Sequence, residues 1–102
     1  MKVRYSANAK AELAAIFAYI ARENPKAADA VVRRIESVVS RLAVFPGTSH
    51  PSDTPAVFVA PLVRYPYSIY FKVENDELII LHIHHTARQP PTLNDQPRMF
   101  VY

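Results

Sequence analysis

The chain has 102 residues, of which 50% are hydrophobic and 21% charged, a composition typical of one globular domain and not of a disordered segment. It contains no cysteine, so disulfide bonds, thiolate catalysis and cysteine-ligated metal sites are excluded. The formal net charge of +3 is a weak indication of a polyanionic or acidic partner.

The N-terminal quarter predicts a short strand followed by an amphipathic helix. Residues 2–5 alternate between polar and apolar side chains, and Ser6 can cap a helix that begins near Ala7. Apolar side chains recur at helical spacing, at Leu13, Ile16, Phe17 and Ile20. The opposite, polar face carries Lys10, Glu12 and Arg22. The chain shows neither the apolar core of a signal peptide nor a run of about 18 apolar residues, so we expect a cytoplasmic protein without a membrane span.

A second helix is predicted directly after the first. Asn24 suits the N-cap and Pro25 the first helical position, while Pro46-Gly47 ends the segment. The short connection between the two helices predicts an antiparallel helical hairpin. Apolar residues separated alternately by three and four positions form the expected packing seam, which comprises Ala28, Val31, Ile35, Val38, Leu42 and Phe45.

Strands are predicted in the second half of the chain. Residues 46–55 read as a polar loop, and residues 56–63 as a strand in which Pro61 implies an edge, a bend or a bulge. Two further apolar runs flank the polar turn Glu74–Glu77, which is typical of a β-hairpin. The run Leu78–Leu81 is apolar on both faces, as expected for a central strand covered by helices.

The order of these elements predicts an α+β fold, β-α-α-β-β-β. In this fold a short N-terminal strand and an antiparallel helical hairpin pack on a small, mostly antiparallel β-sheet. The apolar terminal residues Met99–Tyr102 are expected to dock on the core of the chain or on a partner.

Three motifs stand in order along the chain. Residues 42–47 read Leu-Ala-Val-Phe-Pro-Gly, residues 64–71 read Arg-Tyr-Pro-Tyr-Ser-Ile-Tyr-Phe, and residues 80–90 read Ile-Leu-His-Ile-His-His-Thr-Ala-Arg-Gln-Pro. They are similar to the L…P-G element, the R-x-x-Y-x-I-x-Y strand and the I-L-x-I-x-H-x-x-R-x-P ending of the RelE/ParE superfamily of bacterial type II toxins. The chain resembles the ParE branch more than the ribosome-dependent ribonucleases. The resemblance implies one toxin domain over residues 1–91 and a C-terminal tail over residues 92–102.

The resemblance to the ParE branch implies a toxin that binds and inhibits DNA gyrase. A cognate antitoxin, whose extended segment wraps the toxin surface, would neutralise it. One alternative is a RelE-like endonuclease that cuts messenger RNA in the ribosomal A site, and another is a non-toxic module that binds an antitoxin. A homo-dimer and a toxin–antitoxin hetero-oligomer are both open, and the resemblance implies no cofactor and no metal.

The candidate catalytic residues are Arg64, His85 and Arg88, which would act only in a RelE-like, metal-independent endoribonuclease. Arginine side chains can stabilise the charge on a phosphorane, and a histidine can transfer a proton near neutral pH. A second proton-transfer residue is missing from the motifs, which favours protein binding over catalysis. Structural roles also stay open, as an ion pair for Arg64 and as a strand-end contact for His85.

Three other groups of residues have simpler structural interpretations. His82, His84 and His85 could bind zinc or nickel, but no carboxylate completes the set and we expect no metal site. The aromatic side chains of residues 65–71 are expected to pack rather than to stack on bases. Acidic residues are interspersed among the helical arginines, which predicts solvated faces for Arg22, Arg33, Arg34 and Arg41.

Overall fold

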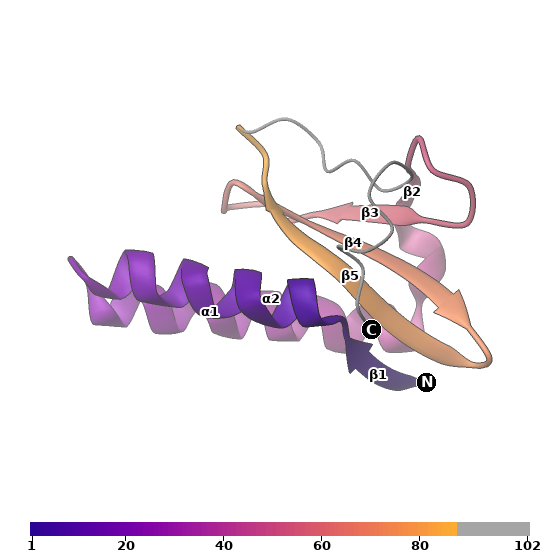
Figure 1. Cartoon of the computed structure of the whole chain (residues 1–102), viewed down its shortest axis with the longest axis horizontal. Coiled ribbons are helices and arrows are strands. Elements are labelled where there is room, and N and C mark those ends of the chain that lie inside the picture. Colours follow the sequence, from indigo (N-terminus) through magenta and orange to yellow (C-terminus); the bar gives the residue numbers. More distant parts are fainter. Residues whose placement is uncertain (88–102) are drawn as a thin grey trace.

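The computed structural model describes residues 1–87, and the predictions for Arg88 and for the C-terminal tail lie outside the described residues. Two helices lie side by side along one face of a five-stranded sheet whose strand order is β1-β5-β4-β3-β2 (Figure 1). The elements are β1 (Lys2–Tyr5), α1 (Ala7–Ala21), α2 (Pro25–Val44), the 3₁₀ turn η1 (Pro46–Thr48), β2 (His50–Pro51), β3 (Phe58–Pro61), β4 (Tyr67–Glu74) and β5 (Glu77–His85). The predicted α+β fold is confirmed.

Both helices begin at the caps that the sequence predicts. The hydroxyl of Ser6 accepts a hydrogen bond from the backbone N–H of Ala9 at 3.0 Å, and the side chain of Asn24 accepts one from Ala27 at 3.1 Å. Each cap satisfies a backbone donor that has no partner inside its helix. Pro25, at the start of α2, needs no such partner because it has no N–H.

The main core lies between the helical hairpin and the sheet. The seam of α2 is buried as predicted from Ala28 to Leu42, and it packs with Ile69 and Phe71 of β4. Phe45 is the exception, because the backbone leaves the helix at this residue and its side chain is 64% exposed. The predicted seam was therefore one residue too long.

The polar face predicted for α1 contains one error. The carboxylate of Glu12 was expected in solvent, but it reaches β5 and accepts a hydrogen bond from the backbone N–H of Ile83 at 2.9 Å. The side of α1 that meets the sheet runs through Ala9, Glu12 and Ile16, which are three and four positions apart. Because Ala9 is small and Glu12 is charged, apolar periodicity does not reveal this side of the helix.

Strand β5 is central in the sheet, with β1 parallel on one side and β4 antiparallel on the other. The β4–β5 hairpin closes through Asn75 and Asp76, whose φ angles of 52° and 60° fit a type I′ turn. Leu78 and Ile80 belong to the core under the helices, whereas Leu81 joins a second cluster. The expectation that helices cover both faces of this strand is therefore met on one face only.

A β-bulge interrupts the β4–β5 ladder. Tyr70 pairs with His82 and Phe71 pairs with Ile80, so that Leu81 has no directly opposite residue. One extra residue increases the local twist and redirects the side chains that follow it. The bulge therefore sets the directions of the side chains at the C-terminal end of β5.

The segment before β4 is more ordered than the predicted loop and strand. His50–Pro51 forms a short edge strand against β3, and β3 itself is limited to Phe58–Pro61. Pro61 is the last residue of β3, which fits its lack of a backbone donor. Between these strands Ala56 has a φ of 66° in a turn that the N–H of Val57 closes on the carbonyl of Thr54.

Candidate functional site

The open end of the β4–β5 hairpin joins two of the residues that the motifs single out. Tyr67 begins β4 and pairs directly with His85, the last residue of β5. Their rings meet edge to face, with centroids 5.3 Å apart and an interplanar angle of 90°. The N–H of Thr86 donates to the carbonyl of Pro66 at 2.8 Å and extends the pairing beyond the strands. The ring contact with Tyr67 and the Thr86–Pro66 hydrogen bond thus stabilise the strand end that carries His85.

One hydrogen bond of His85 indicates the tautomer of its neutral ring. Its Nδ1 lies 3.2 Å from the backbone N–H of Ala87, which can only donate. Nδ1 must therefore act as the acceptor, and the neutral ring carries its proton on Nε2. In this tautomer Nε2 of His85 is a hydrogen-bond donor and not an acceptor.

His85 lines a cavity of about 600 Å³ between α1 and the C-terminal end of β5. The cavity is bordered by polar, aromatic and aliphatic residues of α1, β5 and their neighbours, namely Glu12, Ala15, Ile16, Tyr19, Tyr67, Ile83, His84, His85 and Ala87. Glu12 is its only carboxylate among the described residues, and that carboxylate is already engaged by β5. The ring of His84 meets Tyr70 edge to face, with centroids 6.1 Å apart.

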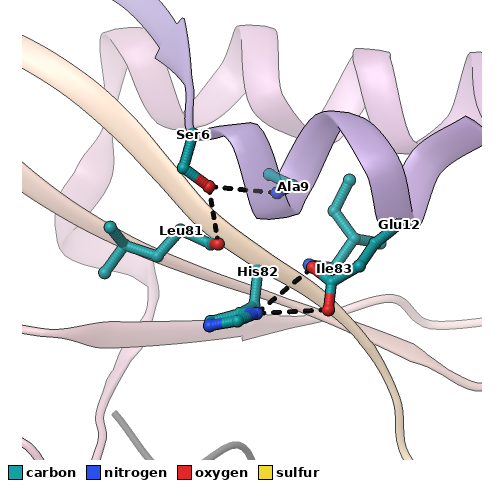
Figure 2. A network of polar contacts seen from close by, with 6 residues as sticks. All are labelled: Ser6, Ala9, Glu12, Leu81, His82 and Ile83. Carbon is teal, nitrogen blue, oxygen red and sulfur yellow. Dashed lines mark hydrogen bonds and ion pairs between the residues drawn. The ribbon is translucent and has the colours of Figure 1, made fainter. Parts of the chain in front are cut away.

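A polar network that includes two of the lining residues, Glu12 and Ile83, joins α1 to β5 (Figure 2). Glu12 accepts from the N–H of Ile83 at 2.9 Å, and its Oε2 lies 3.1 Å from Nδ1 of the buried His82. Ser6, fully buried at the start of α1, donates its hydroxyl proton to the carbonyl of Leu81 at 2.8 Å. These contacts satisfy backbone groups of β5 beyond Ile80, where its pairing with β1 ends.

Arg64 lies apart from His85. It is exposed in the loop between β3 and β4 and lines a different cavity, of about 590 Å³, together with Arg33 and Arg34 of α2. No carboxylate within residues 1–87 comes within 4.0 Å of its guanidinium, so the ion pair that the sequence left open is not formed there. The structure thus brings His85 together with Tyr67 and not with Arg64, while Arg88 is outside the described residues.

Ser6 and Glu12 are the site residues that sequence reasoning missed. Ser6 was identified only as a cap, because nothing in its neighbourhood along the chain points to Leu81, 75 positions away. Glu12 was assigned to solvent because its partners come from β5, about 70 positions away. Neither contact leaves a local signal in the sequence.

A third cavity, of about 430 Å³, lies between the two helices and is mostly apolar. Tyr5, Phe17 and Glu36 are among its lining residues. Burial raises the pKa of the Tyr5 phenol, and the nearby carboxylate of Glu36 raises it further. On the other side of the sheet, burial and then Asp53 raise the pKa of Tyr70.

No group of three metal-ligating side chains is found in the part of the chain that the structure describes. The three neighbouring histidines have different environments: His82 faces Glu12, His84 meets Tyr70, and His85 meets Tyr67. None of the helices within residues 1–87 is long and apolar enough to cross a membrane.

Comparison with known proteins identifies the family. Residues 3–90 match the family model described as "ParE toxin of type II toxin-antitoxin system, parDE". The chain is 30% identical over 92 residues to "Putative toxin Y4kP" of Sinorhizobium fredii (strain NBRC 101917 / NGR234), with 90% of this chain and 96% of that protein covered. A chain of the solved structure "Chromosomal ParDE TA system from P. aeruginosa" is 31% identical, with a TM-score of 0.75 and with 83% of this chain and 95% of that chain covered. The protein therefore belongs to the ParE toxin family of type II toxin–antitoxin systems.

Proposed function

We propose that this ParE-type toxin binds and inhibits DNA gyrase in the bacterial cytoplasm and that a cognate antitoxin neutralises it. The observation that carries the proposal is the match of residues 3–90 to the ParE family model, which spans every described helix and strand except the first residue of β1. Within the RelE/ParE superfamily, inhibition of gyrase is the activity of this branch.

The geometry at the end of the hairpin supports protein binding over catalysis. Metal-free RNA cleavage needs one group to take the 2′-hydroxyl proton and another to protonate the leaving oxygen. His85 offers a donor at Nε2 because its Nδ1 accepts from Ala87, and the carboxylate of Glu12 is occupied by His82 and Ile83. Among the described residues, the cavity that holds His85 thus lacks a free carboxylate to serve as the base.

The proposal can be tested in bacteria that express the toxin from an inducible promoter. Gyrase inhibition predicts growth arrest, plasmids that lose negative supercoils, and messenger RNA without codon-phased cuts in primer extension. Vigorous growth despite soluble expression would favour a non-toxic binding module and contradict the proposal.

The antitoxin part of the proposal has a separate test. Co-expression of the small reading frame next to the toxin gene should restore growth, and its product should co-purify with the toxin. A neighbouring product that neither restores growth nor co-purifies would contradict neutralisation by that protein, while the plasmid measurement would still report on gyrase.

The alternative, RelE-like cleavage of messenger RNA, would rest on Arg64, His85 and Arg88. One observation favours this alternative. Tyr67 and His85 pair at the open end of the β4–β5 hairpin, and Arg64 precedes Tyr67 by three positions in the sequence. Codon-phased cuts that disappear in the Arg88→Ala protein would establish this activity. The same cuts from the wild-type and Arg88→Ala proteins would rule out that catalytic role for Arg88.

A further inference from the structure

We propose that Arg33, Arg34 and Arg64, together with the exposed Val63 beside them, form a docking surface for an acidic segment of a partner protein. We call these four residues the arginine surface. The inference does not depend on which enzyme the toxin inhibits, because it rests on the charge and shape of this surface alone.

Two parts of the chain build the arginine surface. Arg33 and Arg34 project from the middle of α2, and Val63 and Arg64 come from the loop between β3 and β4. Together with Ala30 and Tyr65 they line the cavity of about 590 Å³. Three arginine residues therefore line one cavity, although Arg64 is 30 positions from Arg34 in the sequence.

The charges of this region are only partly compensated. Arg33 forms an ion pair with Asp29 one turn earlier, with Nε and Oδ2 3.0 Å apart. Within residues 1–87, no carboxylate lies within 4.0 Å of the guanidinium of Arg34 or Arg64. Arg34 is also half-buried, so its side chain is held partly against the protein surface. Carboxylates of a partner would provide the ion pairs that Arg34 and Arg64 lack within residues 1–87.

The predicted solvated face is seen at Arg33, whose exposed side chain pairs with the exposed Asp29, but the acidic residues of α2 are not all on this side. Asp29 and Glu36 are the acidic residues of α2, but Glu36 lines the cavity between the two helices, beside Tyr5. Glu36 thus lies at a different cavity from the arginine surface, whereas Asp29 stays paired with Arg33. The side that faces Arg64 is left with a net positive charge.

The apolar part of the surface indicates a peptide and not a nucleic acid. Guanidinium groups bind both carboxylates and phosphates, so the arginines alone do not distinguish a peptide from a nucleic acid. Val63, however, is 85% exposed, and Ala30 and Tyr65 lie in the same cavity. An apolar side chain next to a carboxylate would cover Val63, whereas a sugar–phosphate backbone would leave it in water. The fitting ligand is a segment that combines Asp or Glu with a residue such as leucine.

The experiment measures binding of the full chain to a synthetic, fluorescein-labelled peptide rich in Asp and Glu with interspersed leucines. Fluorescence anisotropy at low ionic strength should show saturable binding, and the Arg34→Ala/Arg64→Ala protein should bind about tenfold more weakly or worse. The matched control is Arg22→Ala, which removes an exposed arginine at the end of α1 and should change the affinity by less than about twofold.

Further variants separate the proposal from its alternatives. Val63→Ser should lower the affinity for the peptide but not the affinity for a single-stranded DNA of equal charge. The reason is that only the peptide would cover the side chain of Val63. Arg64→Ala alone removes an exposed side chain and should leave the fold intact. Its effect on peptide affinity can therefore be measured even if the double variant is unstable. Each protein is compared by its thermal unfolding midpoint to confirm that it is folded.

Three results would overturn the proposal. One is the absence of saturable peptide binding, and another is an equal loss of affinity in Arg22→Ala, which would indicate nonspecific charge attraction. The third is tighter binding of the DNA, lost in the double variant, which would make this a nucleic-acid surface. Gyrase inhibition measured on the same proteins is independent of all three, so the two proposals can fail separately.

Discussion

The carboxylate of Glu12 and the ring of His82 join α1 to the central strand of the sheet, with Oε2 and Nδ1 3.1 Å apart. The same carboxylate accepts from the N–H of Ile83. Strand β1 pairs with β5 only as far as Ile80, and side chains of α1 complete the hydrogen bonding beyond that point. This contact therefore helps to hold the helical hairpin against the strand that carries His85.

Replacing Glu12 should test this contact. Glu12→Ala leaves the N–H of Ile83 without its acceptor and should lower the free energy of unfolding by about 1–3 kcal/mol in urea titrations. Glu12→Gln keeps a side-chain oxygen that can accept from Ile83, so it should lower the free energy of unfolding by less than Glu12→Ala does. Glu23→Ala, in the exposed connection between the helices, is the control and should change the value by about 0.5 kcal/mol or less. Equal effects of the alanine variants would contradict the role of Glu12.

The two N-caps allow a direct comparison. Asn24→Ala removes an exposed cap and should cost about 1 kcal/mol. Ser6→Ala removes a cap that is fully buried and also leaves the carbonyl of Leu81 unpaired, so it should cost about 1–2 kcal/mol more than Asn24→Ala. Urea unfolding of both variants provides the measurement. If Ser6→Ala were the milder of the two, its bond to β5 would contribute nothing to stability.

A residue with a positive φ should become more stable as glycine. Ala56 has a φ of 66° and follows Pro55 in a turn that fits type II, where glycine is the favoured residue. Ala56→Gly should raise the free energy of unfolding by about 0.5–1 kcal/mol. The same substitution at Ala18, exposed in α1, should lower it by about 1 kcal/mol. Two changes of the same sign would show that the strain at residue 56 has no energetic effect.

The raised pKa of Tyr5 predicts a loss of stability in alkaline solution. Because the folded state binds the phenolic proton more tightly than the unfolded chain, the stabilisation is fully present below about pH 10 and is lost as the pH rises through the folded pKa. Tyr5→Phe should therefore lose less stability than the wild type as the pH rises above about 10 in urea titrations. Parallel curves for the two proteins would contradict the shift. Tyr70→Phe should act in the same direction, since its pKa is also raised.

The sequence predicted those parts of the fold that depend on local chemistry. Ser6, Asn24 and Pro25 mark the helix starts through caps, and the seam of α2 follows from helical spacing. The turn at Asn75 and Asp76 follows from residues that tolerate a positive φ. These features need no knowledge of distant contacts.

The features that the sequence did not predict are all non-local. The bulge opposite Tyr70 and Phe71 arises from the fit between two strands, and no residue type announces it. Glu12 faces the sheet because β5 has an unpaired donor there, and Arg64 lies beside Arg34 because the β3–β4 loop passes α2. The sequence therefore pointed to Tyr67 and His85 through their motifs, but it revealed neither the site contacts of Ser6 and Glu12 nor the grouping of the residues.

The most direct test of the account is gyrase-driven supercoiling of a relaxed plasmid, with purified toxin titrated against gyrase. We predict that the wild-type toxin blocks supercoiling or traps cleaved plasmid. His85→Ala should act similarly, because the Nδ1 of His85 is engaged by the backbone N–H of Ala87 and the ring serves the strand end rather than catalysis. Full supercoiling in the presence of excess folded wild-type toxin would contradict the account.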